Sequence, residues 1–505
     1  MSYNQQCTAE YASRNNLPEF EGVFAKSPQL ASPSTKRHRK LFPSLEEAIR
    51  TSGLRDGSTV SFHHAFREGD KVLMHVIKTL SDLGFKNLTI APSSLLNCHD
   101  GLVEYIRSGV IAKIFTSGLR GELGEAVSKG LMDVPVQVHS HGGRVHLIQT
   151  GEISIDVAFL GVASSDEFGN ANGSHGELSC GSLGYAKVDA AHARYVIAMA
   201  QELVDFPNYP ASLSQDQVDA VVTVDEVGDP SLISVGAARL TKNPRDLLLA
   251  RIAASVIEHS GSFKTGFSMQ TGSGGAATAT TIFLGEKMVE KNIKASFALG
   301  GVTGPIVDLL NKGMIGAIAD VQSFDVTAAQ SLRENAAHCE ISANEYANSS
   351  SKGAYVDRVD VVLLSALEVD IDFNVNVLTG SDGVLRGASG GHCDVAAAAN
   401  LTVIVTPLLR SRMPCVVEHV NTVVTPGSTV DVVVTDHGIA VNPNNQALEK
   451  RLRDAKLPVL SIEELKDLAI SRAGKPEPIA YTDKIVAVVR YRDGSVMDVV
   501  RQVAR

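Results

Sequence analysis

A glutamate at the end of an apolar segment, followed by a glycine-rich loop, is the part of this sequence best suited to chemistry. Glu368 comes shortly after residues 359–364 (VDVVLL), an almost wholly apolar and β-branched segment typical of a parallel strand buried on both faces. Ligands of open parallel sheets bind beyond the carboxyl ends of the strands, so an acid placed there is available for chemistry. The loop that follows contains five glycines: Gly380, Gly383, Gly387, Gly390 and Gly391.

The glycine loop predicts a cradle for an anion. Residues without Cβ let backbone N–H groups approach a ligand closely and converge on a developing oxyanion. Glu368 is the predicted catalytic carboxylate, with Gly390 and Gly391 as catalytic oxyanion donors. A second glycine loop at Gly272, Gly274 and Gly275 could donate in the same way. The alternative is a surface turn in which the glutamate only caps or solvates a strand end.

Histidines and arginines lie in several loops that follow predicted strands. Cations and N–H donors suit carboxylates, so these side chains are predicted to bind an anionic substrate, although plain structural roles stay open. The two adjacent histidines should point apart on an extended loop, so a two-histidine metal site is not expected. The predicted substrate-binding residues are His63, His64, Arg67, His139, His141, Arg144, Arg386 and His392.

The elements around these residues alternate between strand and helix, which predicts an α/β fold with mainly parallel sheets. In the first half, strands are expected at residues 58–62, 88–91, 112–116, 134–138 and 151–161. The second half repeats this order, so we predict two tandem, structurally related domains. The expected divisions are a polar arm at 1–43, an N-terminal domain at 44–254 and a C-terminal domain at 255–505. A terminal hairpin is expected across Asp493 and Gly494, with a type I′ turn.

Composition excludes several classes of function. The chain has 505 residues and a net charge of −10, which argues against nucleic-acid binding because phosphate neutralisation needs clustered Lys and Arg. Its six cysteines are scattered and form no C-x-x-C pair, so neither a zinc site nor a disulfide framework is indicated. The sequence has no signal-peptide pattern and no apolar run long enough for a membrane span. We expect a cytoplasmic protein with no bound metal and no membrane partner.

The segment around Glu368, SALEVDIDFNVNV followed by GVLRGASGGHCD, resembles the catalytic segment of the coenzyme A transferases. Over nearly the whole chain, the sequence is similar to one branch of that family, the citrate lyase alpha subunits. The matching stretches are residues 60–67 (VSFHHAFR), 116–121 (TSGLRG), 139–144 (HSHGGR), 166–173 (DEFGNANG) and 266–272 (GFSMQTG).

The resemblance implies two CoA-transferase-like domains and the reaction of acetyl-acyl carrier protein with citrate to give citryl-acyl carrier protein and acetate. Implied partners are the beta (citryl lyase) and gamma (acyl carrier) subunits, with assembly as a homo-oligomer. No cofactor is implied on this chain, which would act on a phosphoribosyl-dephospho-CoA group carried by the gamma subunit. The resemblance also implies thioester contacts at Gly272, Gly274, Gly275, Gly380, Gly383 and Gly387. For Glu368 it leaves open a covalent role or a supporting role in a ternary complex.

Other functions are weighed against this one. A related transferase for another small acid such as citramalate, a thioester hydrolase, or a sugar-phosphate isomerase could use the same acid on a similar scaffold. A nicotinamide dehydrogenase is disfavoured because no predicted strand is followed by G-x-G-x-x-G. A non-catalytic metabolite sensor would keep the crevice and lack turnover.

Overall fold

The protein is described by a computed structural model covering residues 40–233, 241–272 and 274–504. Most of the predicted polar arm at residues 1–43 lies outside these described residues. Its last part contributes β1 (Leu41–Phe42), an edge strand that pairs in parallel with β9 (Ala220–Thr223). Ser44 then caps the first helix, and its side chain accepts a hydrogen bond from the Glu47 N–H.

The first of two large sheets is mainly parallel and contains the predicted strands of the first half. Its strand order is β1-β9-β8-β6-β2-β3-β4-β5-β24-β25, with β7 paired to β6. The remaining strands of this sheet are β2 (Thr59–Phe62), β3 (Leu88–Pro92), β4 (Ile111–Thr116), β5 (Val136–Val138), β6 (Val157–Ser165), β7 (Ala171–Asn172), β8 (Tyr195–Leu203), β24 (Tyr481–Arg490) and β25 (Val496–Val503).

The second sheet belongs mainly to the second half and is also mostly parallel. Its order is β13-β12-β11-β10-β14-β17-β21-β22-β23. The strands are β10 (Ser268–Thr271), β11 (Ala295–Val302), β12 (Ile315–Ser323), β13 (His338–Glu340), β14 (Val361–Ser365), β17 (Leu401–Val405), β21 (Val432–Thr435), β22 (Gly438–Val441) and β23 (Val459–Leu460).

The two sheets have the same topology in their central parts. β2 lies between β3 and β6 in the first sheet, as β10 lies between β11 and β14 in the second. From these centres the series β3-β4-β5 and β11-β12-β13 run one way, and the series β6-β8-β9 and β14-β17-β21 run the other. The prediction of two tandem, related α/β units with mainly parallel strands is therefore confirmed.

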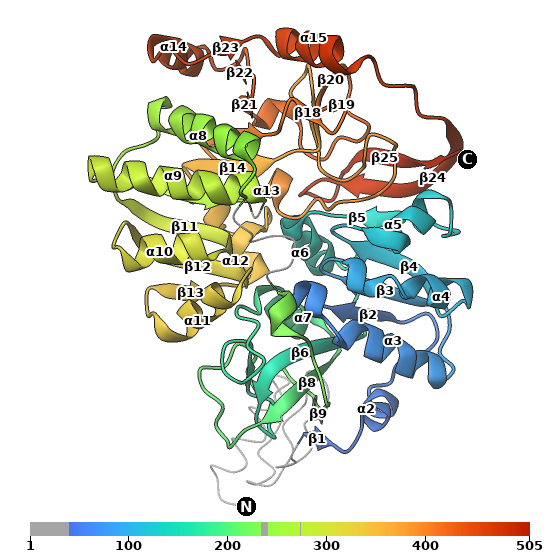
Figure 1. Ribbon diagram of the computed structural model, residues 1–505. Helices are drawn as coiled ribbons and strands as arrows, with labels where there is room; N and C mark the ends of the chain where they lie inside the picture. Colours follow the sequence, from blue (N-terminus) through green and yellow to red (C-terminus); the bar gives the residue numbers. More distant parts are fainter. Residues whose placement is uncertain (1–39, 234–240, 273, 505) are drawn as a thin grey trace, which may run out of the picture. The chain divides into compact units, whose positions relative to one another are not determined.

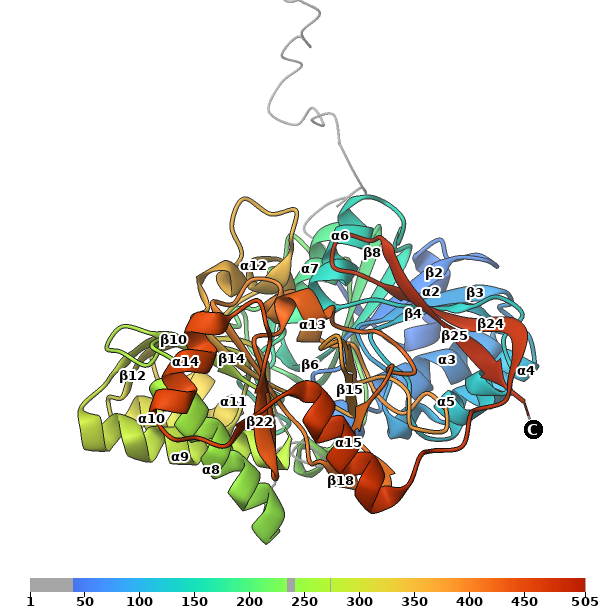
Figure 2. The same ribbon diagram turned by 90° about the horizontal axis from the view of Figure 1, so that it is seen from above.

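Helices flank both sheets and meet at the junction between them. The helices of the first half are α2 (Leu45–Thr51), α3 (Val72–Asp82), α4 (Leu102–Arg107), α5 (Gly121–Ser128), α6 (His141–Gln149) and α7 (Gly184–His192). Those of the second half are α8 (Pro244–His259), α9 (Gly275–Lys291), α10 (Gly304–Asn311), α11 (Val326–Glu334), α12 (Ala343–Ala347), α13 (His392–Ala396), α14 (Gln446–Asp454) and α15 (Ile462–Ala473). Helices α6 and α7 contact α12, and α6 also contacts α13, so these four short helices join the two sheets (Figures 1 and 2).

Smaller pairings complete the second half. A three-stranded sheet in the order β16-β15-β20 contains β15 (Glu368–Asp370), β16 (Val375–Asn376) and β20 (Val416–Val417). A two-stranded sheet contains β18 (Leu409–Arg410) and β19 (Met413–Pro414). Glu368 therefore begins a short strand of its own after β14, rather than following β14 as part of a loop.

The terminal hairpin is present, and it completes the first sheet. β24 pairs in parallel with β5, and β25 covers the other side of β24 (Figure 1). The predicted type I′ turn is wrong, since that turn needs positive φ at two central residues and only Gly494, with φ of 81°, has it. The predicted domain boundary between residues 254 and 255 falls inside α8 (Pro244–His259). The division into two domains at this point stays a prediction.

No helix among the described residues is long and apolar enough to cross a membrane.

Candidate active site

A cavity of about 410 Å³ lies where the two sheets meet. It is lined by residues that follow β2, β3 and β4 of the first sheet and β10 and β14 of the second, so it sits at the carboxyl ends of both sets of parallel strands. Its polar lining includes His64, Arg67, Ser94, Ser117, Arg120, His141, Tyr185, Gln270, Ser365, Ser389, His392 and Arg410.

The charge of the cavity is positive. Arg67, Arg120 and Arg410 line it, and no aspartate or glutamate does so among the described residues. Burial, together with the neighbouring Arg120, lowers the pKa of Arg67 to about 10, which leaves its guanidinium protonated at neutral pH. The same guanidinium lies 4.4 Å from the centre of the Phe324 ring, a cation–π contact that orients it. The cavity is therefore built to receive an anion.

Several buried polar atoms at the cavity have no hydrogen-bond partner within the described protein. Buried polar groups are normally paired, so unpaired ones that line a cavity indicate groups that a ligand would satisfy. They are Arg67 Nε, Ser117 Oγ, His141 Nδ1, Gln270 Oε1 and Ser389 Oγ.

The two serines among these atoms are positioned by a backbone ladder that links the sheets. The Ser389 N–H donates to Ser117 O at 2.7 Å, and the Leu119 N–H donates to Gly387 O at 3.0 Å. The two segments of this bridge approach so closely that a Cβ on Gly118 would lie 2.3 Å from the Cβ of Ala388. Glycine at 118 is thus required for the contact that brings Ser117 and Ser389 together.

His141 is held by a second connection between the halves. Its N–H donates to Gly390 O at 2.8 Å, and the buried carboxylate of Asp394 accepts bonds from Ser140 Oγ at 2.7 Å and Gly142 N at 2.9 Å. Asp394 therefore caps the N-terminus of α6, the helix that His141 begins. Burial, followed by the charges of two arginines, lowers the pKa of His141 to about 3, so its ring is neutral at pH 7.

Tyr185 of α7 packs against both histidines of the cavity. Its ring centre lies 4.9 Å from that of His64 and 4.7 Å from that of His141, and the two histidine rings are 5.6 Å apart. Burial holds the pKa of His64 well below its usual value. The cavity thus combines charged guanidinium groups with neutral imidazoles.

Glu368 lies beside the cavity rather than in its lining. The residue is only 5% exposed, and its carboxylate accepts hydrogen bonds from Asn376 Nδ2 at 2.9 Å and from Asn421 N at 3.4 Å. Burial raises the pKa of Glu368 even though these bonds oppose the rise. The preceding residue, Leu367, does line the cavity, and its carbonyl accepts a bond from the Arg410 guanidinium at 3.2 Å.

Comparison with known proteins identifies the family. Residues 38–503 match the model of the family described as citrate lyase, alpha subunit. The citrate lyase alpha chain of Klebsiella pneumoniae is 63% identical over 494 residues, which cover 98% of this chain and 97% of that one. The chain belongs to the citrate lyase alpha subunit family.

Further relatives support the assignment of this chain to the citrate lyase alpha subunit family. The citrate lyase alpha chain of Escherichia coli K12 is 61% identical over 95% of this chain and 94% of its own. A crystal structure from Streptococcus mutans, described as the alpha subunit of citrate lyase in complex with citrate, superposes with a TM-score of 0.92 at 50% identity, covering 98% of both chains. The fold is shared more widely, since the alpha subunit of an Acinetobacter baumannii malonate decarboxylase has a TM-score of 0.63 at 14% identity.

Nine residues predicted from the sequence line the cavity of this citrate lyase family member. These are His64, Arg67, His141, Gly272, Gly274, Gly387, Gly390, Gly391 and His392. His392 uses both ring nitrogens inside the protein, with Nδ1 2.6 Å from Thr425 Oγ1 and Nε2 3.1 Å from Ser365 O. The geometry therefore suits His392 to holding Ser365 rather than to binding a ligand.

Three other predicted substrate-binding residues lie in the protein interior, outside the cavity lining. Arg144 is 99% buried and donates to both carboxylate oxygens of Asp189, at 2.6 and 3.0 Å. His63 Nε2 lies 2.8 Å from Gly161 O, and His139 Nδ1 lies 3.1 Å from Ser140 O. None of the three lines the cavity, and their contacts with substrate stay predictions.

Arg386 does not line the cavity and is exposed at the surface. It forms an ion pair with Asp382 at 2.5 Å. Gly380 and Gly383 belong to the turn beside this pair, where the Gly383 N–H donates to Gly380 O at 2.9 Å. Gly275 is the first residue of α9 and follows the cavity-lining Gly274. The thioester contacts expected at these glycines stay predictions.

Sequence reasoning did not single out several of the polar cavity residues. Ser117, Arg120, Gln270 and Ser389 lie inside segments that the sequence had marked, beside glycines, so a closer weighing of the polar residues in those segments would have found them. Tyr185 lies in helix α7 and Arg410 in the short strand β18, and neither residue follows directly on a predicted strand. Their places depend on packing between distant segments.

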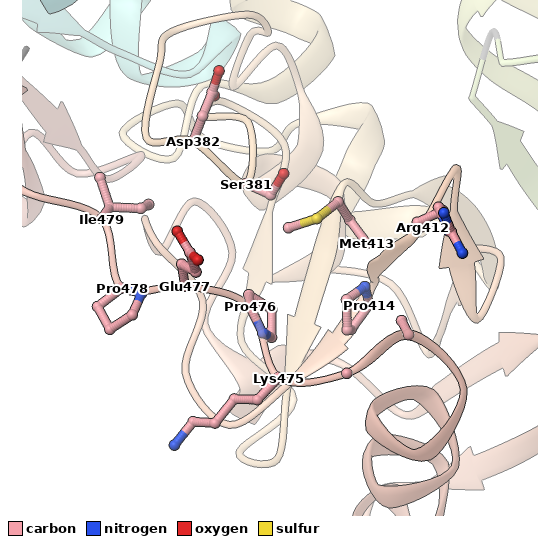
Figure 3. Close-up of a pocket in the computed structure, with 12 residues that line it drawn as sticks. Ser381, Asp382, Arg412, Met413, Pro414, Lys475, Pro476, Glu477, Pro478 and Ile479 are labelled. Carbon is pink, nitrogen blue, oxygen red and sulfur yellow. The ribbon is translucent and has the colours of Figure 1, made fainter.

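A second cavity, of about 470 Å³, is more open and lies beside β19 and the segment that follows α15. Figure 3 shows residues Lys475 to Ile479 crossing one side of it, opposite Arg412, Met413 and Pro414. Its lining contains both acids and bases and none of the predicted site residues. The cavity between the sheets is therefore the candidate active site.

Proposed function

We propose that this chain transfers an acyl carrier between carboxylic acids, converting acetyl-acyl carrier protein and citrate to citryl-acyl carrier protein and acetate. Family membership supports this reaction, and the observation that carries it to this chain is the cavity itself. Three arginines face a space without carboxylates, and unpaired serine, glutamine and histidine atoms surround them. A tricarboxylate supplies the negative charge and the acceptors that the guanidinium and serine hydroxyl groups of this lining lack.

The reaction can proceed without a metal-bound nucleophile. A citrate carboxylate oxygen attacks the acetyl thioester carbonyl, which gives a mixed acetyl–citryl anhydride and releases the carrier thiolate. The thiolate then attacks the citryl carbonyl and releases acetate. Each attack forms a tetrahedral oxyanion, and the donors suited to stabilise it are the serine hydroxyls and the N–H groups of the glycine loop at 387–391. Arg67 and Arg120 would hold the remaining citrate carboxylates.

Glu368 would act in one of two ways. As a nucleophile it would form a glutamyl thioester with the carrier, and as a base or orienting group it would act while citrate attacks directly. Its burial beside the cavity, with its carboxylate held by Asn376 and Asn421, favours the orienting role. We therefore propose the ternary-complex route.

The partners follow from the same proposal. The chain would assemble with the beta and gamma subunits of citrate lyase and act on the phosphoribosyl-dephospho-CoA group of the gamma subunit, in the cytoplasm. We also propose that residues 44–254 and 255–505 are its two domains, with the terminal hairpin completing the first, and that the protein is a homo-oligomer.

The proposal is tested by mixing the purified chain with acetyl-carrier protein and a panel of acids in the presence of a chelator. Mass spectrometry of the carrier should show citryl replacing acetyl with citrate. A preference for citramalate over citrate would show that citrate is not the main substrate. Net hydrolysis of the thioester without exchange would overturn the transferase reaction. In a separate incubation with sugar phosphates, isomerisation would indicate the other enzyme class.

A further inference from the structure

The ring of His64 is fixed by contacts that differ from those of the other histidines near the cavity. Its backbone N–H donates to Ser93 Oγ at 3.1 Å, and its carbonyl accepts a bond from Gln322 Nε2 at 2.8 Å. Its Nδ1 lies 2.5 Å from the same Ser93 Oγ. Ser93 is fully buried, and its own N–H is tied to Phe62 O at 2.9 Å, so the hydroxyl is anchored at the end of β3.

The direction of the bond between Ser93 and His64 follows from counting protons. The hydroxyl oxygen already accepts the His64 N–H, and its own proton needs an acceptor. The only other hydrogen-bond partner of Ser93 Oγ in the described protein is His64 Nδ1. If Nδ1 carried the proton instead, a fully buried hydroxyl proton would have no acceptor, at a cost of about 1–3 kcal/mol. The Ser93 hydroxyl therefore donates to Nδ1, and the ring proton of His64 is on Nε2.

Neighbouring histidines provide a contrast. His63 donates from Nε2 to Gly161 O, and His139 donates from Nδ1 to Ser140 O, so both use their N–H groups inside the protein. His64 Nε2 lies on the side of the ring opposite Ser93 and has no hydrogen bond to the described protein, while His64 lines the cavity. Its N–H is thus free for a ligand. Burial lowers the pKa of His64 well below its usual value, in keeping with a neutral ring.

We propose that Ser93 is a positioning residue that fixes His64 as the Nε2–H tautomer, so that His64 presents a neutral N–H donor to a carboxylate of the substrate. This inference deepens the proposed function and rests on it for the identity of the ligand. A neutral donor binds a carboxylate oxygen without adding a proton that the reaction would later have to remove.

The tautomer can be measured without any enzymatic activity. Protein labelled with ¹⁵N in histidine is studied at neutral pH by long-range ¹H–¹⁵N correlation, and the His64 signals are assigned from their loss in His64→Gln. We expect a protonated Nε2 and an unprotonated Nδ1 in the unaltered protein, and a shift of the proton toward Nδ1 in Ser93→Ala. An Nδ1–H ring, an imidazolium, or an unchanged spectrum in Ser93→Ala would overturn the proposal.

Citrate binding, followed by calorimetry, tests the role of the donor. The amide nitrogen of glutamine reaches about as far as Nε2, and that of asparagine about as far as Nδ1. We expect His64→Gln to keep the citrate Kd within a few-fold, and His64→Asn and Ser93→Ala to raise it about 10-fold, the cost of one hydrogen bond. Ser93→Thr keeps the hydroxyl and should bind like the unaltered protein.

A matched control is present at the surface. Ser350 Oγ lies 2.7 Å from His146 Nδ1, the same pair of groups in an exposed place, and Ser350→Ala should leave citrate binding unchanged. Equal affinities for His64→Gln and His64→Asn would contradict the proposal. If the unaltered protein does not bind citrate, the proposed substrate is wrong, whereas the tautomer measurement still decides the role of Ser93.

Discussion

At the scale of single residues, Arg67 and Arg120 are the cations best placed to bind a substrate carboxylate. A hydrogen bond to a charged group is worth about 1.5–3 kcal/mol, so Arg67→Ala or Arg120→Ala should raise the citrate KM roughly 10- to 150-fold. The KM for the acyl carrier should change much less. Steady-state kinetics with each substrate varied in turn would measure both effects.

Arg386 provides the matched control for these variants. It is an exposed arginine paired with Asp382 outside the cavity, and Arg386→Ala should leave both KM values unchanged. A large increase in citrate KM for Arg386→Ala, with none for Arg67→Ala, would place the substrate elsewhere.

Glu368→Gln keeps the shape of the side chain and removes its charge. If Glu368 orients groups or accepts a proton, the transfer rate should fall by about 10²–10⁴. If it forms a glutamyl thioester, the loss should be larger, and hydroxylamine added to enzyme and acetyl-carrier alone should label Glu368 in stoichiometric amount. We expect no label, and peptide mass mapping would detect one. The exposed acid Glu418, changed to glutamine, serves as a control.

These residues also show how much of the candidate site could be predicted from the sequence. Adjacent residues of an extended segment point apart, so only one of His63 and His64 could face the cavity, and the sequence could not say which. Arg144 could not be assigned to the interior because its partner Asp189 is 45 residues away in the chain. The burial of Glu368 between two asparagines likewise depends on Asn421, which is 53 residues away.

At the scale of elements, Asp394 ties α13 to the N-terminus of α6 and makes the stability of this joint depend on pH. Burial raises the pKa of Asp394 from 3.8 to about 6 in the folded protein. The folded state therefore binds more protons than the unfolded state between these values, so the contribution of Asp394 is most favourable at low pH and declines as pH rises from about 4 to 6.

Asp394→Asn removes this titration. The free energy of unfolding of the variant, relative to the unaltered protein, should increase by up to about 3 kcal/mol between pH 4 and pH 7. Urea unfolding at several pH values would measure it. For Asp454→Asn, at an exposed ion pair with Lys450, the same difference should stay flat. A flat difference for Asp394→Asn would show that this carboxylate has an ordinary pKa.

Most elements were predictable because their signals are local. The capping box of Ser461 and Glu464 is readable in the sequence alone, and α15 begins directly after Ser461 and ends before Gly474. The strand expected at 151–161 was placed too early, since β6 spans Val157–Ser165. Ile153 and Ile155 are buried like strand residues, but pairing with β2 begins only at Val157. Ladder partners come from elsewhere in the chain, so this boundary could not be read from the segment itself.

At the scale of the whole molecule, the C-terminal hairpin protects an edge of the first sheet. Val489 is fully buried and pairs with Val138 of β5, while Val496 of the same hairpin is 62% exposed. Val489→Asp would bury an unpaired charge and should destabilise the protein by about 3 kcal/mol or more, with aggregation through the freed edge. Thermal unfolding and light scattering would measure both.

Val496→Asp is the control, because the same charge at an exposed position should change stability by no more than about 0.5 kcal/mol. Similar behaviour of the two variants would mean that the hairpin does not secure β5. The hairpin itself was predicted from its alternating residues, but its partner strand was not, since that strand lies in the other half of the chain.

The pairing of β24 with β5 also sets an order of events during synthesis. The ribosome completes β5 at Val138 and reaches Tyr481 only after most of the remaining chain has been made. At about 5–20 residues per second, that interval is on the order of tens of seconds. Throughout it, one edge of β5 has no strand to pair with and is open to other nascent chains. A premature stop codon anywhere in the second half would therefore leave the N-terminal sheet unfinished, even though the codons of that sheet's other strands were intact.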